Sequence, residues 1–99
     1  MTIKVIATIE IAAGGEDYAN QYFAATMPLL EQARAEIIDQ MTVDHAIVGD
    51  RVGAQIFVVL YPDIAALNSV FESDAYKQII PTRDKAFSKY SINVIKNDP

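Results

Sequence analysis

The chain has 99 residues, 52% of them hydrophobic and 21% charged, which suits one folded domain and is too short for two packed cores. Eight Lys and Arg residues stand against thirteen Asp and Glu residues, and the formal net charge of -5 argues against nucleic acid as a partner, because a phosphate backbone requires clustered positive charge. The lack of cysteine excludes disulfides, thiol nucleophiles and Cys-ligated metal centres.

No apolar run reaches the length of a membrane span, and the first residues lack the pattern of a signal peptide. We therefore expect a soluble, cytoplasmic protein with no membrane partner. So small a chain buries a limited share of its surface, and this much hydrophobicity suggests that an apolar face is left uncovered. We interpret the surplus as a surface for self-association.

The first expected element is a strand over residues 3–11, where isoleucine, valine and alanine alternate along one face. Glycines at positions 14 and 15 end this pattern. The acidic pair at positions 16 and 17 suits the start of a helix, and apolar residues then recur every three or four positions. This periodicity predicts an amphipathic helix of about 18 residues, with a kink at Pro28.

An extended segment is expected over residues 36–48, in which Val43, His45 and Ile47 share one side. Its first part, residues 37–41, is either a separate short strand or a bulged start. After a turn at 49–53, a second strand of the same hairpin is expected over 54–61. Both faces of that strand are apolar, which is typical of a strand buried on both sides, with one face made of Ile56, Val58 and Leu60 and the other of Phe57, Val59 and Tyr61.

Pro62 and Asp63 end this strand and begin a helix over residues 64–72. Ser73 can cap further helical turns over 74–80, which Pro81 is expected to interrupt or restart. A closing strand is predicted over 89–96, where Tyr90 belongs to the alternating apolar set.

The order strand, helix, strand, strand, helix, strand predicts an α+β, ferredoxin-like βαββαβ fold in a single domain over residues 1–99. It places four antiparallel strands under helices on one face, with the first and third strands in the centre. Because helices cover only one face, the far face of the third strand needs a partner. The simplest partner is a second copy, so we predict a homodimer through the sheet face, as in a dimeric α/β barrel.

The chain also resembles known families. Its opening, IKVIA at residues 3–7 through IAAG at 11–14 and an acidic helix start, is similar to small antibiotic-biosynthesis-monooxygenase-like proteins, which form dimeric α/β barrels. The later part resembles another branch of that superfamily, the domain of unknown function 1330 family, through Gly49, Asp50, Tyr61, Pro62, Ala65, Ala66, Phe71, Ser73, Tyr76 and Arg83. It departs from that branch at Val70, where tryptophan is common, and at Arg34 and Ala35, where two glycines are common.

Three residues are candidates for catalysis. His45 is the only histidine and titrates near neutral pH, so it could act as a base, although a lone histidine is commonly structural. Tyr76 and Arg83 lie seven residues apart, two helical turns if the helix continues through Pro81. Arginine could then hold a carboxylate or enolate while tyrosine donates to a carbonyl. The alternative is that Tyr76 packs on the sheet and Arg83 pairs with Asp84.

Tyr18, Tyr22 and Phe71 are the candidate ligand-binding residues. Tyr18 and Tyr22, spaced i and i+4, could line one wall of a cleft between helices and sheet, or serve as core aromatics with hydroxyls that reach solvent. Phe71 is assigned to the inward face of its helix. No residue spacing predicts a metal site, and no cofactor is expected.

Two functional hypotheses stand side by side. The resemblance implies a pocket for a small apolar or aromatic metabolite, oxidised by a monooxygenase-like enzyme without metal or flavin. The alternative is a non-catalytic, ligand-binding or structural homodimer, which accounts for the few polar candidates equally well. An isomerase-like activity would need a clearer base than this chain offers.

Overall fold

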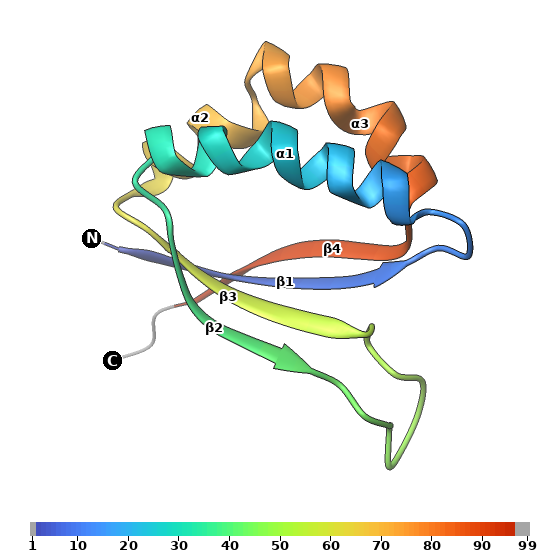
Figure 1. Cartoon of the computed structure of the whole chain (residues 1–99). Coiled ribbons are helices and arrows are strands. Elements are labelled where there is room, and N and C mark those ends of the chain that lie inside the picture. The colour runs from blue at the N-terminus through green and yellow to red at the C-terminus, as the bar shows by residue number, and fades with distance from the viewer. Residues whose placement is uncertain (1, 97–99) are drawn as a thin grey trace.

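The computed structural model describes residues 2–96 and has a ferredoxin-like α+β fold (Figure 1). Its elements follow the order β1 (Ile3–Ile11), α1 (Glu16–Gln32), β2 (Glu36–Thr42), β3 (Gln55–Tyr61), α2 (Ile64–Phe71), α3 (Asp74–Ala86) and β4 (Phe87–Ile95). The four strands form one sheet in the order β2-β3-β1-β4, with antiparallel pairing throughout. The predicted fold class is therefore confirmed, with the first and third strands at the centre.

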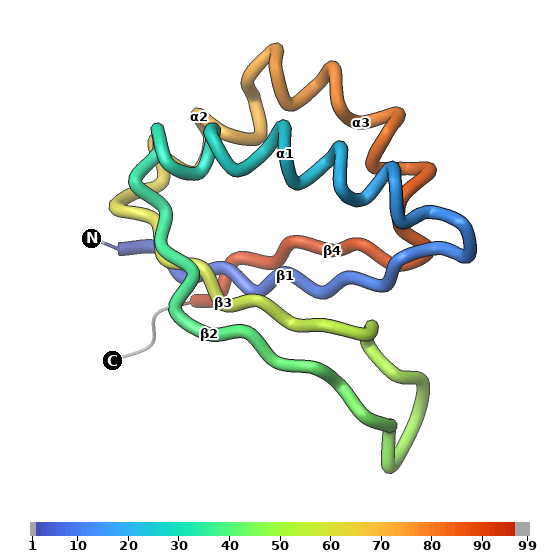
Figure 2. Tube along the Cα trace, viewed as in Figure 1, coloured from blue at the N-terminus to red at the C-terminus, as the bar shows by residue number. Residues whose placement is uncertain are grey.

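All three helices lie over one face of the sheet, as the trace in Figure 2 shows. The register sets which side chains face them: Val5 of β1 stands beside Val59 of β3 and Val94 of β4. The next row belongs to the opposite face and places Ile6 beside Val58. Helices and sheet enclose a core of twelve buried hydrophobic side chains, namely Val5, Ile9, Ala19, Tyr22, Ala33, Val59, Tyr61, Leu67, Val70, Tyr76, Ala86 and Phe87.

The strand expected over residues 36–48 is shorter than predicted. β2 ends at Thr42, its pairing with β3 contains an irregularity between Ile37 and Asp39, and residues 43–54 form an irregular loop. The base of this loop is tied to the sheet by an ion pair of 2.7 Å between Arg51 and Glu10. One further hydrogen bond, from the Val43 amide to the Ala54 carbonyl oxygen at 2.9 Å, follows the β2–β3 pairing, and the alternating pattern beyond it is an irregular loop rather than a strand.

The helix expected to break at Pro81 is instead continuous as α3, and β4 starts at Phe87 rather than at residue 89. Proline removes one backbone donor, but the turns on both sides of Pro81 are intact and α3 packs along α1. The break falls earlier, between Phe71 and Asp74, where Ser73 accepts a hydrogen bond from the backbone amide of Tyr76 at 3.0 Å. The second helical region is thus two helices with a capped start to the second.

Within residues 2–96, no helix is both long enough and apolar enough to cross a membrane. The expected cellular location stays a prediction.

Candidate functional site

Three tyrosine hydroxyls from different elements meet between the helices and the sheet. Tyr22 of α1 shares a hydrogen bond with Tyr76 of α3, at 3.0 Å between the two oxygens, and another with Tyr90 of β4. The hydroxyls of Tyr76 and Tyr90 are 3.5 Å apart. We call Tyr22, Tyr76 and Tyr90 the hydroxyl cluster.

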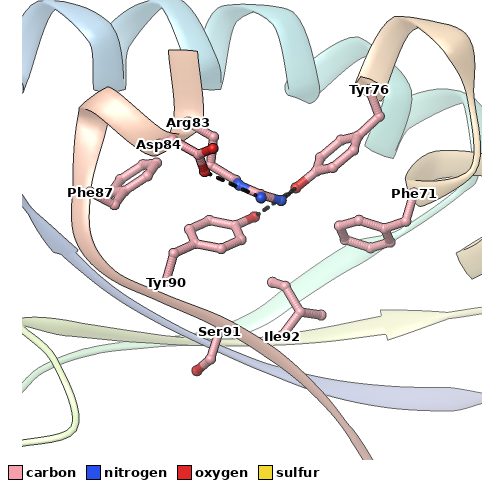
Figure 3. A pocket seen from close by; sticks show the side chains of 8 residues that line it. All are labelled: Phe71, Tyr76, Arg83, Asp84, Phe87, Tyr90, Ser91 and Ile92. Carbon is pink, nitrogen blue, oxygen red and sulfur yellow. Dashed lines mark hydrogen bonds and ion pairs between the residues drawn. The ribbon is translucent and has the colours of Figure 1, made fainter. Parts of the chain in front are cut away.

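Arg83 adds a positive charge to one side of the hydroxyl cluster. Its Nη1 donates to the Tyr76 hydroxyl at 3.2 Å, and its guanidinium carbon lies 5.4 Å from the centre of the Tyr90 ring (Figure 3). Nη2 contacts Asp84 at 3.4 Å, but the Asp84 side chain is mostly exposed. Tyr76 and Arg83 therefore face one site from the same side of α3, as their seven-residue spacing predicts, and Arg83 also makes the alternative contact with Asp84.

Local structure explains how the hydroxyl cluster is positioned. The Ser73 cap begins α3 three residues before Tyr76. At the other end, Gly15 brings the start of α1 against the junction of α3 and β4, since a Cβ there would lie 2.6 Å from the Ala86 carbonyl oxygen. Edge-on aromatic contacts then hold the Tyr22 ring on Phe87 and on Tyr90, with centroids 5.4 and 5.5 Å apart.

Two cavities adjoin the hydroxyl cluster. The outer cavity, about 480 Å³, lies between α3 and β4 and is lined by Arg83, Asp84, Phe87 and Ser91 together with shared residues (Figure 3). The inner cavity, about 320 Å³, extends under α1 across the helix-facing side of the sheet, where its walls include Val5, Phe57 and Leu30. The two cavities share four lining residues: Phe71, Tyr76, Tyr90 and Ile92. The lining of the inner cavity is thus mostly apolar, and its polar members are the hydroxyl cluster together with Thr26, Gln40, Gln55 and Tyr61.

Burial holds the hydroxyls of Tyr22, Tyr61 and Tyr90 in their neutral form. Burial, reinforced by the neighbouring tyrosines, raises the pKa of Tyr22 far above its ordinary value, and burial likewise raises the pKa of Tyr90. Burial together with Tyr76 raises the pKa of Tyr61, in the inner cavity wall, to about 12. These groups are therefore hydrogen-bond donors and acceptors at neutral pH rather than bases.

Of the residues predicted for the site, the structure brings together Tyr22, Phe71, Tyr76 and Arg83. Tyr18 lies elsewhere: it is partly exposed, Lys85 stacks over its ring at 5.5 Å, and it lines neither cavity.

His45 also lies apart from both cavities. It was expected on a strand beside Val43 and Ile47, and this placement is wrong because β2 ends at Thr42. It lies in the loop over 43–54, its ring Nδ1 is 3.0 Å from Asp44, and its side chain is 67% exposed.

Tyr90 is the site residue that the sequence analysis missed. It appeared there only as one member of an apolar alternation, although the register pairs it with Ile9 on the helix-facing side of the sheet. The sequence signal that could have revealed Tyr90 is that three tyrosines fall on elements that pack against one another, between the helices and the sheet. Among residues 2–96, no group of three or more His, Cys, Asp or Glu side chains could hold a metal ion.

The fold and the cavity define a ferredoxin-like α+β protein with a cavity between helices and sheet. The family model described as "Domain of unknown function (DUF1330)" matches residues 5–97, so the chain belongs to that family, as its resemblance implied. No curated protein matches this chain.

Solved structures share the fold. A protein of unknown function from Rhodopseudomonas palustris is similar over 99% of this chain and 83% of its own, with 17% identity and a TM-score of 0.83. PA3566 from Pseudomonas aeruginosa is similar over 99% and 95%, with 17% identity and a TM-score of 0.66. SnoaB, a cofactor-independent oxygenase from Streptomyces nogalater, is similar over 99% and 94%, with 5% identity and a TM-score of 0.64. At these identities the likeness shows the fold alone.

Proposed function

We propose that this protein binds a small apolar or aromatic metabolite in the inner cavity. The observation that carries the proposal is the contrast within that cavity, where apolar walls end at the hydroxyl cluster. Small-molecule sites commonly combine an apolar enclosure with a few polar groups that set the ligand's orientation. In this proposal Phe71 contacts the ligand's apolar body, and Tyr22 and Tyr76 contact its polar end. Arg83 lines the outer cavity and acts through its hydrogen bond to Tyr76.

A thermal-shift screen of the purified protein against aromatic metabolites tests the proposal, because a ligand that binds only the folded state raises the melting temperature. Ala7→Phe should abolish the shift, since residue 7 lines the inner cavity and a larger side chain would fill it. Ala25→Phe, on the exposed side of α1, is the matched control and should keep the shift. A ligand that stabilises both variants equally would place the binding site outside the inner cavity.

The catalytic form of the proposal is a cofactor-independent, monooxygenase-like oxidation of that ligand. It is supported by an apolar enclosure and by hydrogen-bond donors that can stabilise an ionised substrate. The competing form is a non-catalytic ligand-binding or structural protein, supported by an inner cavity that no described His, Asp or Glu side chain lines. Oxygen uptake with each stabilising compound separates them: uptake that is lost in Ala7→Phe supports catalysis, and binding without uptake supports the non-catalytic form.

We further propose that two copies associate through the sheet face opposite the helices. Ile6, Ile56, Val58 and Leu60 lie on that face, and no described helix covers them. A four-residue apolar patch in the middle of a sheet is suited to packing against the same face of another copy. Sedimentation at micromolar concentration should give twice the chain mass of 10.9 kDa, and a single 10.9 kDa species would exclude the dimer.

A further inference from the structure

We propose that the inner cavity accepts its ligand as an anion, with the anionic oxygen held by the hydroxyls of Tyr76 and Tyr90 beside Arg83. The ligand class is an apolar, ring-sized body that carries one phenolate, enolate or carboxylate oxygen. This inference rests on the proposed ligand binding and specifies its chemistry.

The first support is the supply of donors. Tyr76 and Tyr90 line both cavities, and their hydroxyl oxygens are 3.5 Å apart, at the outer limit of a hydrogen bond. An oxygen placed between them can accept from both, in place of that long contact and of one of the two Tyr22 contacts, while the Tyr22 hydroxyl donates to the other tyrosine. Arg83 is adjacent, and its contacts with the described residues use two of its five donors, one to Tyr76 and one to Asp84. Donors aimed at one point stabilise negative charge there.

The second support is the lack of a proton acceptor at this point. The titratable side chains that line either cavity, within residues 2–96, are Tyr22, Tyr61, Tyr76, Tyr90, Arg83 and Asp84. The tyrosines with raised pKa values stay protonated at neutral pH, and arginine stays charged. The Asp84 carboxylate belongs to the outer cavity, contacts Arg83 and is 66% exposed. A ligand in the inner cavity must therefore be acidic enough to ionise without a basic side chain of the protein to accept its proton.

The proposal is tested with para-nitrophenol, whose neutral and ionised forms absorb at different wavelengths. We expect the bound probe to ionise at least one pH unit below the free probe, which corresponds to about tenfold tighter binding of the anion. Para-nitroanisole, which has the same ring but cannot ionise, should bind at least tenfold more weakly than the phenolate. Para-nitrobenzoate tests whether carboxylates belong to the ligand class. If it binds as tightly as para-nitrophenolate, the class includes carboxylates, and if it binds more weakly, the class is restricted to phenolates and enolates.

Variants locate the effect on the protein. Tyr90→Phe, Tyr76→Phe and Arg83→Met should each weaken binding of the phenolate about tenfold or more. The two tyrosine variants each remove a donor to the charged oxygen, and Arg83→Met removes the positive charge beside them. Binding of para-nitroanisole should change little, which also shows that each variant is folded. Tyr18→Phe and Lys85→Met are the controls, since they alter a tyrosine and a cation outside both cavities.

The contradicting results are distinct. If the bound probe ionises at a higher pH than the free probe, or if the phenolate and the anisole bind equally, the anion preference is wrong while the ligand-binding function stands. Unchanged phenolate affinity in all three site variants would likewise overturn the assignment to these donors. If none of the three probes binds and no compound in the thermal-shift screen does, the proposed function fails together with this inference.

Discussion

The two faces of β3 look alike in the sequence and differ in the fold. Val59 and Tyr61 point toward the helices and are buried, with exposed fractions of 7% and 2%. Val58 and Leu60, on the other face, are only partly buried, although they are equally apolar. The helix-facing side borders a cavity that has polar groups in its lining, whereas the opposite side carries a four-residue apolar patch, which polar residues such as Asp39 and Asn93 adjoin. In our proposal one strand therefore serves two purposes, a ligand cavity on one side and a subunit contact on the other.

The largest effect is expected from a charge on the helix-facing side. Val59→Asp should lower the free energy of unfolding by about 3 to 5 kcal/mol, because it leaves a buried carboxylate without a partner. Val94→Asp is the matched control: residue 94 lies in the same row across the sheet but is 54% exposed, so a small loss is expected. Urea denaturation measures both. Equal losses would mean that strand propensity, not burial, determines the result.

A charge on the opposite face should change association more than folding. Val58→Lys is preferable to an acidic substitution because Asp39 lies opposite residue 58 on β2, and a lysine can pair with it in the single chain. We expect sedimentation to shift toward the 10.9 kDa species while the circular dichroism spectrum is retained. Val52→Lys, in the exposed loop, should leave association unchanged. A Val58→Lys protein that remains fully dimeric would move the interface to another surface.

Alkaline pH should destabilise the helix-facing side through its tyrosines. The pKa of Tyr61 is raised from 10.0 to about 12, so the unfolded state loses its proton first, and stability present below pH 10 is lost as the pH rises toward 12. A shift of about two pKa units sets the contribution of this one group at most at about 2.7 kcal/mol. Tyr61→Phe should flatten the dependence of urea stability on pH over this range. An unchanged slope would show that Tyr61 ionises as easily in the folded state as in the unfolded state.

The smallest effect is expected away from both faces, in the turn after α1. Arg34 has a φ of 59°, a left-handed conformation, and the amide of Ala35 donates to the Leu30 carbonyl at 2.9 Å. Arg34→Gly should therefore raise the free energy of unfolding by about 1 kcal/mol, because glycine adopts this conformation without the clash of a Cβ. Ala24→Gly, inside α1, should have the opposite sign. If both substitutions lower the free energy of unfolding, the contacts of the Arg34 side chain stabilise the fold by more than its left-handed backbone conformation destabilises it.

The local patterns of the sequence were enough for the order of the elements. Alternation and helical spacing predicted every strand and helix region, and the cap at Ser73 was read correctly. The errors fell at element ends. An alternating pattern beyond Thr42 cannot become a strand without a neighbour to pair with, and Pro81 does not end a helix whose flanking turns remain intact. Both outcomes depend on contacts with distant residues.

The candidate site was predictable only in part, for the same reason. Tyr76 and Arg83 are on one helix, so their common orientation follows from the helical repeat, and the sequence by itself determined it. The hydroxyl cluster joins residues 54 and 68 positions apart in the chain. Only the packing of α1 and α3 over β4 decides that Tyr22 and Tyr90 reach Tyr76, because no local spacing encodes which faces meet. Composition and periodicity determined the fold class and its apolar faces, whereas the tertiary structure alone brought three hydroxyls from three elements together where the two cavities adjoin.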